Sequence, residues 1–152
     1  MSIPSGIRIT DDCINAVHLL RSGKRAAKLR FVIFKVSDDQ QSVVVDETSS
    51  ESDYEIFRQK LCSTDNDICG FLPPPRFAVY DVEYDLGLDG KRSKPVFISW
   101  VPANTPLKLC MVYASCKEQL RRSLDIGIFI HADSQDEIEW EAVLKQASGG
   151  KA

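Results

Sequence analysis

The chain has 152 residues, which suits one domain that buries about two thirds of the surface of its unfolded chain. Its hydrophobic share of 43% and charged share of 27% are ordinary for a globular protein, and its net charge of −3 gives no overall attraction for nucleic acid. The sequence has neither an apolar run of membrane-spanning length nor a signal-peptide core near its start, so we expect an intracellular protein.

Charge is unevenly placed along the chain. Acidic residues gather at 46–55 and 133–141, whereas basic residues gather at 21–30, 91–94 and 117–122. Attraction to an acidic partner would therefore come from local patches and not from the net charge. The cysteines are odd in number and none forms a C-x-x-C pair, which argues against a disulfide framework and a zinc site. We expect reduced thiols and no bound metal at Cys13, Cys62, Cys69, Cys110 and Cys116.

The first part of the chain predicts an arm, a helix and a hairpin. Residues 1–10 contain Pro4 and Gly6, which discourage a helix, so we expect a loose N-terminal arm. A helix follows over 11–20. Strands at 29–36 and 42–46 then form a hairpin with a nearly continuous apolar run, as in a sheet that is covered on both faces.

The middle of the chain predicts a second helix and a second hairpin. An acidic loop at 47–53 precedes a helix at 53–62, and the connector 63–75 ends in three prolines. Those prolines suit a stiff loop or, alternatively, a ligand for a proline-recognition domain. Strands at 76–84 and 95–101 flank a turn at Asp89 and Gly90. The cations beside this turn suit a solvated hairpin tip as well as a contact surface.

The segment 105–124 predicts a long helix. Thr105 is a suitable N-cap, Pro106 suits the first helical position, and Gly127 marks the expected end. One apolar stripe at three- and four-residue steps should face the core, formed by Leu109, Val112, Tyr113, Cys116, Leu120 and Leu124.

The opposite face of this helix carries a methionine among charged residues. Met111 points nearly away from the stripe, with Ser115, Glu118 and Arg122 around it. A soft, unbranched side chain in that position suits contact with a partner, although a single exposed apolar residue is also common. A short strand at 126–132, a helix from 140 to 147 and a flexible end at 148–152 complete the chain.

Residues 108–122 read Lys-Leu-Cys-Met-Val-Tyr-Ala-Ser-Cys-Lys-Glu-Gln-Leu-Arg-Arg. This segment resembles the long actin-binding helix of the ADF/cofilin family, whose pattern there is basic-x-Lys-Met-(Val/Ile)-Tyr-Ala-Ser-Ser-Lys-Asp-x-(Leu/Ile)-(Arg/Lys)-(Arg/Lys). Residues 90–102 resemble the family's projecting hairpin and its second strand, and Ala-Val-Tyr-Asp at 78–81 resembles the strand before it. The match is dense over 76–124 and collinear elsewhere, so it covers most of the chain.

The resemblance implies an α/β fold of the α+β type. It predicts one ADF-homology domain over 1–152, with a central mixed sheet of five to six strands and helices on both faces. It also implies a monomer in the cytoplasm and nucleus that binds monomeric and filamentous actin and promotes severing and depolymerisation by binding, without catalysis or a cofactor. The implied actin contacts are Ser5, Gly6, Ile7, Arg92, Lys94, Lys108, Met111, Lys117, Glu118, Arg121, Arg122 and Lys145.

The resemblance also implies two kinds of regulation. Ser5 stands before Gly6 and Ile7, where the family carries its regulatory phosphorylation site, and Ser2 is a competing acceptor. Phosphoinositide headgroups are expected to compete for the basic residues of the long helix.

Two departures from the family pattern bear on the strength of actin binding. Cys110 replaces a lysine, and the last helix carries only Lys145 as a charge over 145–149, which weakens filament binding more than monomer binding.

Other functions remain open at this point. The same fold can serve monomer sequestration, or binding to filament sides or actin-related complexes with weak severing. A phosphoinositide-binding membrane-surface module is an alternative of another class. An enzyme has the least support, because the sequence has no glycine-rich phosphate loop and no metal-ligand spacing, and Cys116 lies on the core stripe.

Overall fold

The computed structural model describes residues 7–22, 29–37, 39–51, 53–62, 75–103 and 105–149. The remaining residues include Ser2, Ser5, Gly6 and Cys69, so the predictions made for these positions, for most of the connector 63–75 and for residues 150–152 lie outside the described part. The helices and strands are β1 Arg8–Ile9, α1 Asp11–Ser22, β2 Phe31–Val36, β3 Ser42–Ser49, α2 Tyr54–Cys62, β4 Arg76–Asp85, β5 Lys91–Trp100, α3 Leu107–Leu124, β6 Ile128–Ala132 and α4 Trp140–Ser148.

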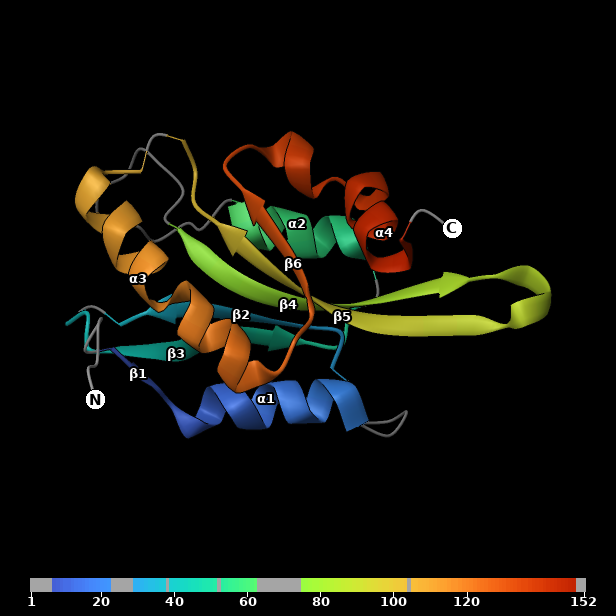
Figure 1. Cartoon of the computed structure of the whole chain (residues 1–152), viewed down its shortest axis with the longest axis horizontal. Coiled ribbons are helices and arrows are strands. Elements are labelled where there is room, and N and C mark those ends of the chain that lie inside the picture. The colour runs from blue at the N-terminus through green and yellow to red at the C-terminus, as the bar shows by residue number, and fades with distance from the viewer. Residues whose placement is uncertain are drawn as a thin grey trace.

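The six strands form one mixed sheet in the order β1-β3-β2-β4-β5-β6 (Figure 1). The outer pairs β1–β3 and β5–β6 are parallel, whereas the three inner pairs are antiparallel. This confirms the predicted mixed sheet of five to six strands. The strand β3 extends to Ser49, three residues beyond the predicted end, so part of the expected acidic loop belongs to the sheet.

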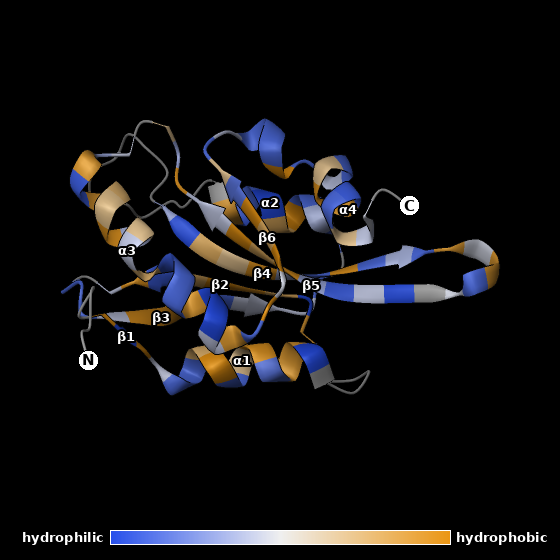
Figure 2. Cartoon of the chain, in the orientation of Figure 1, coloured by the Kyte–Doolittle hydropathy of each residue, from blue (hydrophilic) through white to orange (hydrophobic). Residues whose placement is uncertain are grey.

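Helices cover both faces of the sheet, as the continuous apolar run of β2 predicted. Successive side chains of a strand point to opposite faces. Phe31 and Ile33 belong to the core on the side of α2 and α4, whereas Val32 and Phe34 belong to the core on the side of α1 and α3. Figure 2 shows the hydrophobic segments of the strands between the two helical layers.

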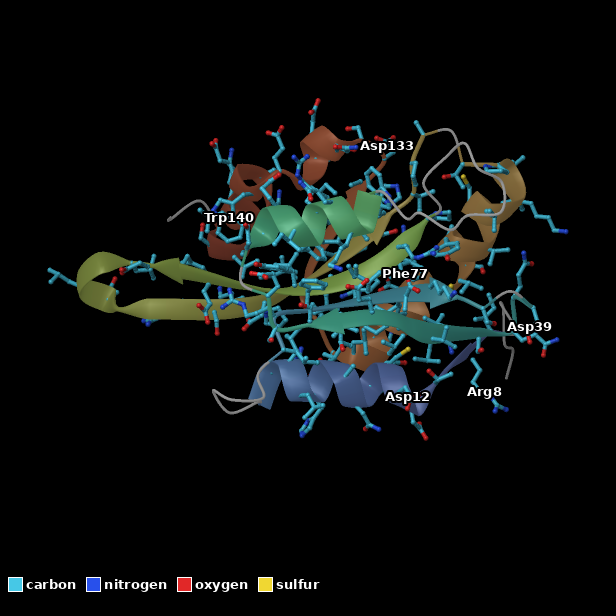
Figure 3. The ribbon with its side chains drawn as sticks, turned by 180° about the vertical axis from the view of Figure 1, so that it is seen from behind. Arg8, Asp12, Asp39, Phe77, Asp133 and Trp140 are labelled. Carbon is cyan, nitrogen blue, oxygen red and sulfur yellow. The ribbon has the colours of Figure 1, made fainter. Side chains whose placement is uncertain are left out.

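The core on the α2–α4 side is rich in aromatic rings. Trp140, labelled at the start of α4 in Figure 3, lies 5.1 Å from the ring of Tyr54 on α2, measured between ring centres. The Tyr54 hydroxyl donates a hydrogen bond to the carbonyl of Ile138 at 2.5 Å, just before α4. These contacts fix α2 and α4 against each other and against the sheet.

The hairpin of β4 and β5 extends beyond the rest of the sheet (Figure 1). Strand β2 pairs with β4 only as far as Tyr80, and β6 pairs with β5 only from Val96 onward. Within the described structure, the strands over 82–94 therefore form an arm in which they pair only with each other, since the N–H of Asp81 still donates to the Arg30 carbonyl at 2.9 Å. A short 3₁₀ turn at Gly87–Asp89 closes the arm at its tip.

Candidate functional site

The helix α3 is anchored by the predicted apolar stripe. Tyr113, Cys116, Leu120 and Leu124 are buried in the core on the α1–α3 side, and Leu109 and Val112 pack against its edge. The Tyr113 hydroxyl accepts a hydrogen bond from the backbone N–H of Val36 at 3.0 Å, which ties α3 to the end of β2. Because one face of α3 is fixed in this way, its opposite face points to solvent.

The start of α3 and the residue that terminates it differ from the prediction. The helix begins at Leu107, and Pro106 occupies the N-cap position without a side-chain capping bond. Thr105 was therefore wrongly predicted as the cap. It is 8% exposed, and its hydroxyl finds no hydrogen-bond partner among the described residues. The helix ends at Leu124, the last residue of the predicted segment, and Asp125 in place of Gly127 adopts the left-handed conformation after it, at φ 55°.

The solvent face of α3 carries two apolar side chains one turn apart. Met111 is 63% exposed, as the sequence predicted, and Leu107 is 75% exposed. The four-residue spacing places them on the same face of the helix, and Lys108 beside them is exposed. Leu107 is a residue that the sequence analysis missed, because it was seen only as part of the helix start. The four-residue spacing between Leu107 and Met111 is the signal in the sequence that could have identified it.

The charged side chains of α3 differ in whether they contact other groups of the protein. Arg121 forms an ion pair with Glu118 and donates a hydrogen bond to the Ile126 carbonyl at 3.1 Å. A separate hydrogen bond from the Arg121 guanidinium to the Glu118 carboxylate lowers the pKa of the Glu118 carboxyl. Lys117 is half-buried, with its Nζ 5.3 Å from the centre of the Phe129 ring. Arg122 is exposed, so it is the more accessible of the two arginines.

Cys110 lies between this exposed face and the core. Its thiol is 3.5 Å from the Thr105 carbonyl oxygen, and it borders a surface hollow together with Ala114, Lys117 and His131. Cys116 is fully buried, and burial raises the pKa of its thiol to about 11. Within the described ranges there is no group of three or more His, Cys, Asp or Glu residues arranged to hold a metal ion.

The beginning of the described chain is attached to the sheet. Ile7 is only 5% exposed and belongs to the core, and the Thr10 hydroxyl donates a hydrogen bond to the Val43 carbonyl at 3.0 Å. The loose arm predicted for residues 1–10 therefore does not include residues 7–10. The buried side chain of Ile7 supports the sheet edge, and its expected contact with actin stays a prediction. Ser5 and Gly6 lie outside the described residues.

A second charged surface lies away from α3. Arg92 and Lys94 are exposed on the hairpin arm, and Lys145 is exposed on α4. The helix α4 ends at Ser148, and Gly149 follows at φ 66°, which confirms the predicted stop. Ser148 is buried, so the end expected to be flexible from residue 148 is still helical there. The structure thus separates the predicted contacts into the α3 face and the surface of the arm and α4.

No helix among the described residues is long and apolar enough to span a membrane. The profile of the family described as cofilin/tropomyosin-type actin-binding protein matches residues 6–148. Cofilin from Gibberella zeae is 40% identical over 152 residues, covering 97% of each chain, and cofilin from Saccharomyces cerevisiae is 36% identical over 96% of this chain and 95% of its own.

Solved structures of other proteins share this fold along nearly the whole chain. The crystal structure of Streptomyces griseoflavus cofilin has a TM-score of 0.80 at 34% identity and covers 95% of this chain and 98% of its own. Coactosin from Entamoeba histolytica has a TM-score of 0.75 at 22% identity, with 96% and 97% covered, and supports the fold alone.

Proposed function

Since the chain belongs to the cofilin/tropomyosin-type family of actin-binding proteins, we propose that it binds monomeric and filamentous actin and promotes filament disassembly. It does so by binding and not by catalysis. The observation that carries this proposal is the exposed pair Leu107 and Met111 on a helix whose other face is fixed in the core. Such a pair on a rigid support supplies apolar contact area at a small ordering cost.

The face of α3 is the proposed site for one actin molecule. Leu107 and Met111 form its apolar centre, and Lys108, Lys117, Arg121 and Arg122 supply positive charge around it. Glu118 also lies on this face, and its carboxylate orients Arg121. The cations attract an acidic partner locally although the whole chain carries a charge of −3.

The arm and α4 are the proposed site for a neighbouring subunit of the filament. Arg92, Lys94 and Lys145 are the cations available there. A protein that binds two subunits at once favours a changed subunit arrangement only if it binds that arrangement more tightly. This difference in affinity is the proposed source of severing. Because Lys145 is the one charged residue over 145–149, we expect monomer binding to be the stronger of the two activities.

Two regulatory roles are proposed for the same surfaces. Phosphorylation of Ser5, with Ser2 as the competing acceptor, would add a charge of about −1.5 to −2 and repel an acidic partner. Phosphoinositide headgroups would compete with actin for Lys108, Lys117, Arg121 and Arg122. We place the protein with the actin cytoskeleton in the cytoplasm and also in the nucleus, as a monomer.

The experiment that tests the proposal measures affinity for actin monomers and for filaments side by side, together with direct imaging of filament breakage. Binding to both forms with breakage supports the full proposal. Monomer binding without breakage supports sequestration, and filament binding without breakage supports a side-binding protein. No binding to either form contradicts the proposal. Binding to phosphoinositide vesicles that persists at saturating actin would favour an independent membrane function.

A further inference from the structure

Two acidic segments of the sequence, which the proposed function does not use, lie side by side in the fold. Segment 46–55 reaches the start of α2, and segment 133–141 reaches the start of α4. The Arg58 guanidinium on α2 donates a hydrogen bond to the side-chain oxygen of Gln135 at 3.4 Å, and the Tyr54 hydroxyl donates one to the Ile138 carbonyl. The fold therefore joins on one surface the carboxylates of two segments that are far apart along the chain (Figure 1).

A surface hollow of about 540 Å³ opens at this junction and has an aromatic wall. The ring of Trp140, labelled in Figure 3, lies 5.1 Å from that of Tyr54 and 6.4 Å from that of Tyr80, measured between ring centres. Tyr54 and Tyr80 are buried, whereas Trp140 is half-buried, so Trp140 presents the most accessible ring of the three. The volume is in the range of sites that hold a ligand or a side chain of a partner.

The charge of this hollow is mainly negative. Its lining includes the carboxylates of Asp53, Glu55 and Glu83, all exposed, and the guanidinium of Arg30. Glu83 pairs with Arg30 at 3.1 Å and Glu55 pairs with Arg58 at 2.8 Å, so three carboxylates stand against two cations. The Asp53 carboxylate also accepts the backbone N–H of Glu55 at 3.0 Å, which fixes it at the start of α2. The excess negative charge attracts a cation, and the fixed carboxylate gives that cation a defined position.

An arginine of the chain itself shows which cation this kind of site accepts. The Arg30 guanidinium lies 6.0 Å from the centre of the Tyr80 ring and pairs with Glu83. A planar guanidinium suits a ring face next to a carboxylate, because it stacks on the ring and donates hydrogen bonds to the oxygens. Trp140 and Asp53, which line the same hollow, offer this combination to a second guanidinium, and tryptophan is the ring that attracts cations most strongly.

We propose that the hollow between α2 and α4 binds an arginine side chain from a basic segment of a partner protein. The guanidinium stacks on Trp140 and pairs with Asp53, and the exposed Glu139 and Glu141 next to Trp140 attract the flanking basic residues of that segment. This partner differs from the acidic one proposed for α3, since its charge is opposite. Helix α3 packs in the core on the other face of the sheet, so both partners can be bound at once, and the inference does not depend on the proposed function.

The test measures, by fluorescence anisotropy, the binding of a fluorescein-labelled peptide of alternating arginine and glycine, with lysine and glutamate peptides of the same length as matched probes. We expect the arginine peptide to bind saturably and more tightly than the lysine peptide, and the glutamate peptide not to bind. Asp53→Asn should weaken binding of the arginine peptide by about three- to tenfold, and it spares α2 because asparagine caps helices as well as aspartate does. Asp12→Asn makes the same change in the exposed first turn of α1 and should leave the affinity unchanged.

The ring of Trp140 is tested separately. Trp140→Leu should weaken binding of the arginine peptide by about two- to fivefold, and Trp140→Phe, which keeps a ring, should weaken it less. Trp140 also reports on binding in the wild type, because the other tryptophan of the chain, Trp100, is only 2% exposed. The tryptophan emission should therefore change as the arginine peptide is added. Circular dichroism checks that each variant is folded.

Several outcomes overturn the inference. No binding of the arginine peptide, or an unchanged tryptophan emission, removes the site. Equal weakening by Asp53→Asn and Asp12→Asn would show attraction to the net charge and not to the hollow, and equal affinity for the arginine and lysine peptides would exclude a guanidinium site. A dimer of the protein alone, seen by analytical ultracentrifugation and lost in Asp53→Asn, would make a second copy of the chain the occupant. Loss of binding to actin monomers in Asp53→Asn would place the hollow within the actin surface instead.

Discussion

Replacing Met111 with Ser removes the apolar centre of the proposed α3 surface without opening the core. Met111 is 63% exposed in the free protein. Full burial of a methionine is worth about 1.5 to 3 kcal/mol, so covering the exposed part is worth about 1 to 2 kcal/mol. The corresponding loss of affinity for actin monomers is about five- to thirtyfold.

The effect on folding should be small, because serine lowers helix propensity by only about 0.5 kcal/mol. Affinity is measured by equilibrium titration of labelled monomeric actin, and the free energy of unfolding by urea denaturation. Leu19→Ser is the matched control, since Leu19 is 49% exposed but lies on α1. The reasoning is refuted if Met111→Ser binds like wild type, or if Leu19→Ser weakens binding equally.

Three further predictions concern charge and titration. Replacing Arg121 and Arg122 together with Ala should weaken monomer binding by about three- to thirtyfold, and an unchanged titration curve would argue against the α3 site. Arg121→Ala alone should also lower the free energy of unfolding, because it loses the bond to the Ile126 carbonyl, whereas Arg122→Ala should not. Ser5→Glu should weaken monomer binding relative to Ser5→Ala, as measured in the same titration; equal affinities would remove the proposed switch. Burial raises the pKa of Cys116 to about 11 from an ordinary value of 9.0, so its contribution to stability is present below pH 9.0 and is lost as the pH rises toward 11. Urea denaturation should show a decline over this range that is about 2 to 3 kcal/mol larger in the wild type than in Cys116→Ala.

The parts of the fold that could be predicted are those where spacing along the chain decides burial. The apolar steps of 109–124 identified the buried side of α3, and the continuous apolar run at 31–36 indicated a sheet covered on both faces. In each case the apolar residues recur at the positions that must be buried in the native core. The exposure of Met111 followed from the same geometry, because Met111 lies on the side of the helix opposite the apolar stripe.

The errors arose where tertiary contacts override local preference. Thr105 is a good cap by residue type, but the helix begins at Leu107, which puts Pro106 at the N-cap position. The helix stops at Leu124 as expected, but Asp125, and not Gly127, adopts the left-handed conformation after it. Ile7 looks like part of a flexible arm until β1 pairs with β3 and its side chain enters the core. No local pattern specifies that pairing.

For the candidate surface, the sequence indicates the residue types but not how accessible each side chain is. The sequence identified the cations of 108–122, but only the structure shows that Arg121 and Lys117 are partly held by Glu118 and Phe129. Leu107 was missed because it was seen only as the start of the helix, although its four-residue spacing to Met111 places both on one face. Its exposure depends on the rest of the fold.

The central claim is that the solvent face of α3 binds actin, and hydroxyl-radical footprinting with mass spectrometry tests it most directly. The oxidation rate of Met111 is compared in the free protein, with saturating monomeric actin and with filaments, and Leu19 on α1 serves as the internal reference. We predict that Met111 is protected by both forms of actin, whereas Leu19 is protected by neither. A Met111 oxidation rate that stays unchanged while actin is bound would contradict the account.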